Sequence, residues 1–250
     1  MNDASQTIKR FLKAVSPPIL WEAVRKKRQT HLPPPPPDYQ GVVTHHSMRW
    51  LHEGRFADIY DRYRTLNPQN SPNLTRLRQY CACMFADYAK GVKGDFLSAG
   101  ISYGVAPRVI YDFVDFGRLG KTYHFIDPFT GVNNPSEGGT HQYNTDPDFV
   151  RKQYPVDAPI QIHRELIPDC FPLEGLEALA FVHANTTHAQ AEAASLPYWY
   201  ERLSPGGFIV IDYYSYGKGQ YEYYDSIIDD IGASAFSMVT GQGVIQKPIR

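Results

Sequence analysis

One short stretch constrains the fold more than any other: residues 94–104, which read Gly-Asp-Phe-Leu-Ser-Ala-Gly-Ile-Ser-Tyr-Gly. The apolar part predicts a short buried strand, and the glycines that follow predict a turn. A helical run follows from Val105, and residues 121–127 predict a second strand that ends on the carboxylate of Asp127. In such a unit the glycines let the backbone approach a ligand, and the acid binds two ribose hydroxyls. The pattern fits a nucleotide-type cofactor site, and it also fits an ordinary crossover of a parallel sheet.

The chain from Asp95 onward alternates strand-like and helix-like patterns. Helices are expected near residues 105–117, 146–153, 189–203 and 218–231. Strands are expected near residues 95–99, 122–127, 159–163, 178–184, 207–212, 234–239 and 243–247. A glycine turn over 240–243 separates the last two strands, which predicts a hairpin.

These elements predict an α/β fold with a Rossmann-like, mostly parallel seven-stranded sheet and a C-terminal antiparallel hairpin. The run Phe208–Ile211 is continuously apolar, as in a strand that is buried on both faces of a parallel sheet. A parallel sheet that finishes with such a hairpin is the arrangement of class I S-adenosylmethionine-dependent methyltransferases. In open α/β sheets ligands bind beyond the carboxyl ends of the strands, so the residues just after each strand are the candidate site.

The N-terminal part of the chain differs from the rest. We expect three regions: a basic amphipathic segment with a polyproline linker over 1–45, a helical cover over 46–92, and the catalytic domain over 93–250. The segment 8–28 has an apolar helical face with lysines and arginines around it. It predicts either peripheral contact with an anionic membrane surface, or a helix that packs on the core or on a second subunit in a homo-oligomer.

Charge and cysteine content narrow the functional class. The net charge is −1, so nothing predicts a nucleic-acid partner. The three cysteines are odd in number and lack metal-ligand spacing, which indicates a reducing cytoplasm. We expect a cytoplasmic protein without a secretory signal or a spanning segment, with the inner face of the membrane as the alternative location. Three nearby histidines, at 45, 46 and 52, have no cysteine or carboxylate at ligand spacing, so a metal there is not expected.

Four motifs in this order resemble the macrocin O-methyltransferase family, which methylates sugar hydroxyls. The motifs are Gly-Asp-Phe-Leu-Ser-Ala-Gly, Phe-Ile-Asp-Pro-Phe-Thr-Gly, Arg-Leu-Ser-Pro-Gly-Gly-Phe-Ile-Val-Ile-Asp-Tyr-Tyr and Thr-Gly-Gln-Gly-Val-Ile-Gln-Lys-Pro. The resemblance covers roughly residues 70–250. It implies S-adenosylmethionine as the cofactor and a small, sugar-containing acceptor as the substrate.

The resemblance also implies which residues bind the cofactor. Gly100 and the backbone after it would pass the methionine part, and Asp127 would hold the ribose. Ser98 stands where the family usually has an acid that contacts the methionine ammonium. The residues implied as cofactor-binding are Ser98, Ala99, Gly100, Ser102, Tyr103, Asp127, Pro128 and Phe129.

The residues after the fourth and fifth strands, where the methyl transfer would take place, depart from the family pattern. The family usually has Asp-x-Asp after the fourth strand and Asp-Asp-Tyr after the fifth, and these carboxylates hold Mg²⁺. Here the first pair falls on Asn185 and Thr187, and the second falls on Asp212 and Tyr213. Bound Mg²⁺ is therefore doubtful, with only Asn185 and Asp212 as weak candidate ligands.

Histidines are the candidate replacement at this end. His183 and His188 flank Asn185, and either could take a hydroxyl proton as the methyl group transfers, with Asp212 helping to orient the acceptor. His141 lies in the loop after Asp127. A structural interpretation stays open for both: His183 as a buried strand-end residue, and His188 as a solvent-facing residue at a helix start.

The sequence thus predicts an S-adenosylmethionine-dependent O-methyltransferase for a small glycosylated or polyhydroxylated acceptor, for which bound Mg²⁺ is doubtful. The missing carboxylates motivate one alternative, a catalytically inactive methyltransferase-like binding or assembly protein. A nicotinamide-dependent enzyme is a third hypothesis, against which the closing hairpin argues.

Overall fold

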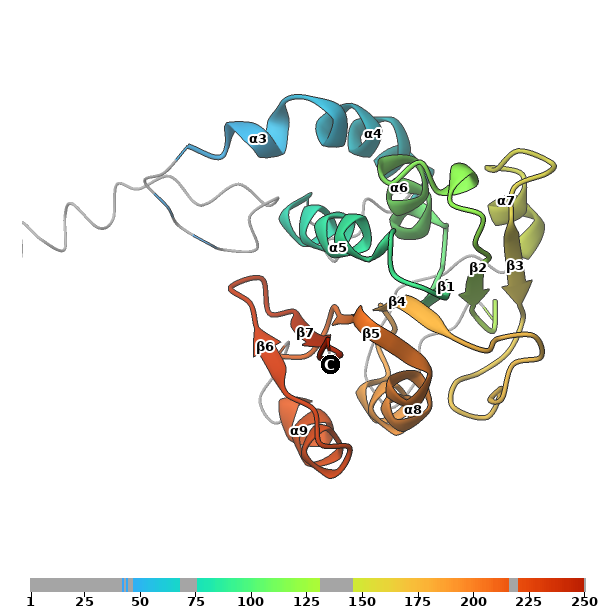
Figure 1. The fold of residues 1–250 in the computed structure, drawn as a ribbon. Coiled ribbons are helices and arrows are strands. Elements are labelled where there is room, and N and C mark those ends of the chain that lie inside the picture. Colours follow the sequence, from blue (N-terminus) through green and yellow to red (C-terminus); the bar gives the residue numbers. More distant parts are fainter. Residues whose placement is uncertain are drawn as a thin grey trace, which may run out of the picture. The chain divides into compact units, whose positions relative to one another are not determined.

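The structure is a computed structural model that describes residues 42, 44, 47–67, 76–130, 146–215 and 220–249, all within the unit Pro37–Arg250. In this part of the chain a seven-stranded sheet has the order β3-β2-β1-β4-β5-β7-β6 (Figure 1). The strands are β1 (Asp95–Ala99), β2 (Tyr123–Ile126), β3 (Ile160–His163), β4 (Leu179–Ala184), β5 (Leu203–Ile211), β6 (Ala235–Ser237) and β7 (Gly243–Gln246).

The first five strands are parallel, and the last two close the sheet in the opposite sense. Strand β1 lies between β2 and β4, with Ser98 in register with Phe125 on one side and His183 on the other. Strand β7 runs antiparallel to both β5 and β6 and so lies between them. The expected parallel sheet with a terminal antiparallel hairpin is confirmed.

Two hydrophobic cores cover the two faces of the sheet, because successive side chains of a strand point to opposite faces. On one face Phe96, Phe181 and Val210 join the core formed with the helices that precede and follow β1. On the other face Leu97, Val182 and Ile209 join the core formed with the two C-terminal helices. All six of these strand residues are fully buried, as expected for a sheet with helices on both faces.

The helices divide between these faces (Figure 1). Four of them belong to the first core: α3 (Arg49–His52), α4 (Arg55–Tyr63), α5 (Arg76–Ala89) and α6 (Val105–Phe113). Helices α8 (Ala189–Arg202) and α9 (Gln220–Asp230) pack on the opposite face. The short helix α7 (Pro147–Arg151) begins at Asp146, whose carboxylate accepts a hydrogen bond from the Asp148 amide, with proline at the first helical position.

Two of the expected helical regions contain interruptions or end in short 3₁₀ turns. In the helical cover expected over 46–92, the first helical stretch is interrupted at Gly54, where φ is +82°, and it ends in a 3₁₀ turn over Arg64–Leu66. Helix α6 ends at Phe113, and a separate 3₁₀ turn covers Phe116–Arg118. The break at Gly54 and the one before Phe116, where Asp115 has φ of +52°, fall at glycine or at left-handed backbone, where a helix cannot continue without strain.

Strand β5 begins earlier than the sequence predicts. Residues 204–207, Ser-Pro-Gly-Gly, are expected to be a turn, but the strand already starts at Leu203. Leu203 is in parallel register with Leu179, and the Gly206 amide donates to the Lys247 carbonyl at 2.8 Å. Proline is tolerated here because it lies at the start of the strand rather than in its centre.

Several sequence-based expectations lie outside the described residues: the segment 8–28, the polyproline stretch 33–37, His45, His46 and His141. The proposed division at 45 and 92, the membrane or homo-oligomer contact, and the cytoplasmic location therefore stay predictions. Among the helices of the described residues, none combines the length and the apolar character that crossing a bilayer requires.

Candidate functional site

The turn after β1 is organised around the carboxylate of Asp127 at the end of β2. Oδ2 of Asp127 accepts hydrogen bonds from the backbone amides of Ile101 at 2.8 Å and Ser102 at 2.9 Å. Oδ1 accepts one bond from the amide of Phe129 at 2.8 Å. A carboxylate has about four acceptor positions, so with respect to the described residues Oδ1 retains one. That position can accept one further hydrogen bond, and the expected binding of ribose hydroxyls by Asp127 stays a prediction.

Gly100 is required at its place because the loop after β4 packs directly on it. Its φ is +84°, and a Cβ built there would lie 2.3 Å from the carbonyl oxygen of Asn185. The loops after β1 and β4 are also hydrogen-bonded to neighbouring strands. The Gly100 amide donates to the Ile126 carbonyl, and the Asn185 amide donates to the Ala99 carbonyl. The glycine thus brings the strand ends of β1, β2 and β4 together, which is an explanation independent of any ligand.

The other predicted cofactor residues divide between this turn and the core. Ser102 and Phe129 both have positive φ, at 50° and 49°, which marks the two turns as tightly shaped. Tyr103 is half-buried, accepts a bond at its carbonyl from Gln153, and packs edge-on against Phe149. Pro128 is half-buried beside Asp127.

Three predicted cofactor residues point into the protein instead. The hydroxyl of Ser98 lies 2.8 Å from that of Tyr123 in the first core, and Ser98 is 1% exposed. Ala99 and Phe129 are also buried, each in one of the two cores. The structure therefore gives Ser98 a partner in the core, where the sequence argument had it contact the methionine ammonium.

At the ends of β4 and β5, the structure brings His183 and Asp212 together. Nε2 of His183 lies 3.2 Å from Oδ1 of Asp212, an ion-pair distance without the alignment of a good hydrogen bond. Their side chains are 1% and 7% exposed, so both are buried. Because Phe181 stacks near His183, the imidazole lies in an apolar layer with Asp212 as its polar neighbour.

Two further residues complete this cluster, and the sequence analysis missed both. Gln242, from the turn before β7, donates from Nε2 to Oδ1 of Asp212 at 2.7 Å and to the carbonyl of Arg78 at 3.2 Å. Arg78, on α5, is buried, and its guanidinium lies over the Tyr213 ring. A buried arginine and a buried glutamine are unusual enough to be signals, but their partners are distant in the sequence.

The neighbours of Asp212 keep it ionised. Burial alone would raise the pKa of this carboxyl, but His183, Arg78 and the hydrogen bond from Gln242 outweigh burial and hold the pKa below its usual range. Buried charges persist only when they are compensated in this way.

This donor set does not fit Mg²⁺. Asp212 is the one carboxylate at the predicted positions, its Oδ1 already faces His183 and Gln242, and Arg78 places a positive charge beside it. Mg²⁺ requires several oxygen ligands in near-octahedral geometry, which a neutral Asn185 and one such carboxylate do not supply. Within the described ranges no group of three or more histidine, cysteine, aspartate or glutamate side chains is arranged to hold a metal ion.

His188 lies apart from the buried pair, in the loop between β4 and α8. It is the residue that precedes α8, and its side chain is half-buried. Its backbone amide donates to Oγ1 of Thr186 at 3.2 Å. His188 is thus held by its loop at the carboxyl end of β4 and is partly exposed, whereas His183 is buried.

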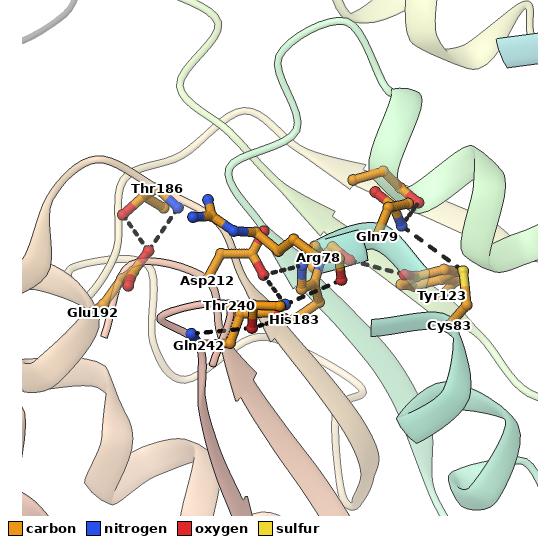
Figure 2. Close-up of polar contacts among 12 residues, drawn as sticks. Arg78, Gln79, Cys83, Tyr123, His183, Thr186, Glu192, Asp212, Thr240 and Gln242 are labelled. Carbon is orange, nitrogen blue, oxygen red and sulfur yellow. Dashed lines mark hydrogen bonds and ion pairs between the residues drawn. The ribbon is translucent and has the colours of Figure 1, made fainter. Parts of the chain in front are cut away.

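A buried carboxylate that the sequence analysis did not single out lies beneath this loop. Glu192, on α8, is 0% exposed and accepts bonds from the amide and the hydroxyl of Thr186 (Figure 2). The sequence signal was an acid on the apolar face of a helix, which is weak without knowledge of its partners.

The fold is shared with solved methyltransferases at low sequence identity. The O-methyltransferase NovP matches with a TM-score of 0.58 and 18% identity, over 69% of this chain and 80% of that one. A Corynebacterium glutamicum protein matches with a TM-score of 0.56 and 13% identity, over 92% and 98%. The methyltransferase PaMTH1 of Podospora anserina, solved with S-adenosylhomocysteine bound, matches with a TM-score of 0.51 and 12% identity, over 84% and 100%.

These comparisons, together with the strand order, define the fold class as the Rossmann-like fold of class I methyltransferases. No protein-family model matches the chain, and no curated protein matches it.

Proposed function

We propose that this protein is an S-adenosylmethionine-dependent O-methyltransferase that acts on a hydroxyl of a small glycosylated or polyhydroxylated acceptor. The observation that carries the proposal is the position of β7, antiparallel between β5 and β6, in an otherwise parallel sheet. A plain nicotinamide-binding Rossmann domain has no such ending. The likeness to NovP and to PaMTH1 supports the same class, and the four motifs support a sugar-containing acceptor.

The cofactor half of the site is the turn 100–104 with Asp127. When bound, the cofactor would supply a sulfonium-activated methyl group. Asp127 would accept one ribose hydroxyl at Oδ1, while its three backbone bonds hold the turn in place. We propose Ala99, Ser102, Tyr103, Pro128 and Phe129 as parts of the same turns, chiefly through their backbone.

The chemical half uses a histidine rather than a metal-bound carboxylate. His188 is our proposed general base, because it is partly exposed and lies at the carboxyl end of β4, where ligands bind in open α/β sheets. The His183–Asp212 pair is too deeply enclosed to meet an acceptor without rearrangement, and we assign it to the support of this end of the site. Positioning of the acceptor hydroxyl in line with the methyl group supplies most of the rate.

Methyl transfer tests the proposal directly. Purified protein is incubated with methyl-labelled S-adenosylmethionine and a panel of nucleotide-activated sugars and glycosylated natural products, in parallel reactions that contain either a chelator or added Mg²⁺. We expect one acceptor to gain one methyl group by mass spectrometry. Cofactor binding without transfer to any acceptor would favour the catalytically inactive alternative, and a strict requirement for added Mg²⁺ would contradict the metal-free assignment.

The variant His188→Gln tests the proposed base, with His52→Gln on the exposed surface of α3 as the matched control. Loss of a general base lowers kcat by roughly 10²–10⁴-fold. We expect that loss for His188→Gln and an unchanged rate for the control. A full rate in His188→Gln with a large loss in His183→Gln would move the assignment to the buried histidine.

A further inference from the structure

Glu192 joins three separate parts of the molecule through one buried carboxylate. Oε1 accepts from the backbone amide of Thr186 at 2.6 Å and from its hydroxyl at 2.7 Å. Oε2 accepts from the hydroxyl of Tyr224, on α9, at 2.7 Å. The side chain comes from α8, so the carboxylate ties two helices to the loop that leaves β4.

This arrangement suits an ionised carboxylate. All three groups are donors, and Glu192 and Tyr224 are both 0% exposed. A buried charge is costly unless donors replace the lost water, and hydrogen bonds to a charged group are stronger than those between neutral groups. Glutamate at this position is therefore hard to explain as simple packing, for which an apolar residue would serve better.

The loop that Glu192 holds is the one that meets the cofactor turn. Thr186 follows Asn185, whose backbone packs on Gly100 and bonds to Ala99. Oγ1 of Thr186 also accepts from the amide of His188. A chain of contacts thus runs from Glu192 through Thr186 to the proposed base.

We propose that Glu192 is a positioning residue that fixes the 185–188 loop, and so sets where His188 stands relative to the turn at Gly100. We call the hydrogen bonds of Glu192 to Thr186 and Tyr224 the Glu192 clamp. The expected effect on kcat rests on the proposed function, but the clamp itself can be observed without catalysis. Glu192 does not contact the reacting groups, and it acts through Thr186.

The charged and titratable surroundings make the clamp sensitive to pH. Burial raises the pKa of Glu192 to about 7, although the bonds from Thr186 and Tyr224 act in the opposite direction, and the Asp212 carboxylate adds to the rise. Near Tyr224, the hydroxyl of Tyr214 bonds to Asp225 on the same helix. Protonation of Glu192 would remove the negative charge, so the hydrogen bonds from Thr186 and Tyr224 would become weaker.

The decisive variants are Glu192→Gln and, as the matched control, Glu201→Gln, which removes an exposed carboxylate from the same helix. We expect Glu192→Gln to lower kcat at least tenfold while the KM for S-adenosylmethionine changes less than twofold, because the base moves and the cofactor turn does not. Glu201→Gln should match the wild type in both constants. A kcat unaffected by Glu192→Gln, or a parallel rise in KM, would overturn the proposal.

Nuclear magnetic resonance provides a readout that needs no turnover. In the wild type, the amide proton of Thr186 should titrate with a midpoint near the pKa of Glu192. Glu192→Gln should abolish the Thr186 titration, and Glu201→Gln should preserve it. A Thr186 amide that is insensitive to both variants would contradict the clamp.

Tyr224→Phe keeps the proposal testable if Glu192→Gln does not fold. This variant removes one donor and leaves the carboxylate in place, so the charged form is less stabilised and the Thr186 midpoint should move to higher pH. An unchanged or lower midpoint would contradict the role of Tyr224. If the clamp is observed but no S-adenosylhomocysteine binds, the proposed function fails and the positioning of the loop remains.

Discussion

The two halves of the site are built in different ways. At the ends of β1 and β2, the carboxylate of Asp127 accepts hydrogen bonds from three backbone amides. Two of these amides belong to the turn after β1, and the third belongs to Phe129, just after Asp127. At the ends of β4 and β5 they are buried side chains from four separate elements, with Asp212 facing His183 and Gln242. The structure of the first half therefore depends on the backbone conformation of its turns, and that of the second half depends on buried charges that compensate one another.

This difference predicts how each half responds to change. A backbone turn tolerates new side chains wherever space and φ allow, and fails where they do not. A buried polar cluster tolerates changes in shape but not the removal of one charge from a compensated set. Substitutions in the two halves should therefore differ in the physical cause of their effect on stability as well as in its magnitude.

The largest effect should come from Gly100→Ala. The new Cβ would meet the Asn185 backbone at 2.3 Å in a residue with φ of +84°, and neither backbone can yield easily. We expect a loss of about 4 kcal/mol in the free energy of unfolding, measured by urea denaturation. Gly120→Ala is the control, because φ is +66° but the space is open. It should cost only about 1 kcal/mol, and equal losses would show that the contact with Asn185 is not the constraint.

Asp212→Ala should have the next largest effect. The change removes the anion that His183 and Arg78 face inside the protein. Loss of one partner of a buried charged set costs about 3 kcal/mol in the free energy of unfolding. Asp230→Ala on the exposed side of α9 is the control, with an expected change within about 0.5 kcal/mol. If the two variants are equally stable, Asp212 is not part of a compensated cluster.

The pH dependence of stability should give a smaller but distinctive effect. The pKa of Glu192 is raised, chiefly by burial, from 4.5 to about 7, so the native state binds a proton that the unfolded state has already lost in this range. Stability from this group is complete below pH 4.5 and declines as pH rises to 7, by about 2–3 kcal/mol.

Chemical denaturation at a series of pH values measures this decline. Glu192→Gln should remove it, so the difference in unfolding free energy between variant and wild type should change across the window and be flat above it. Asp212 acts with the opposite sign, because its lowered pKa gives stability that is lost only on stronger acidification. A constant difference from pH 4.5 to 7 would mean that Glu192 is not held in an apolar site.

Much of the fold was predictable, because local patterns determine it. The continuous apolar strands and the glycine turn before β7 each carry a signal within a few residues. The start of β5 was not predictable, since Ser204–Gly207 has the composition of a turn and becomes strand only through its pairing with Leu179 and Lys247. Tertiary pairing overrides local preference at such places.

The candidate site was predictable only in part, for the same physical reason. Gly100 and Asp127 lie in one short unit, so their proximity follows from the sequence. Gln242 meets Asp212 from a distant turn, and Glu192 is explained only by partners on a loop and another helix. No local pattern shows that a buried acid has its donors, and Ser98 shows the converse, since its hydroxyl was expected to meet a ligand and bonds to Tyr123.

Binding of S-adenosylhomocysteine, measured by isothermal titration calorimetry with a chelator present, tests the central claim most directly. The wild type should bind one molecule per chain, and Asp127→Ala should bind it at least about tenfold more weakly, because a hydrogen bond to a charged group is lost. Asp230→Ala should bind as the wild type does. Absence of binding to folded wild-type protein, or equal affinity in Asp127→Ala, would contradict the assignment of the turn at Gly100 and Asp127 as the cofactor site.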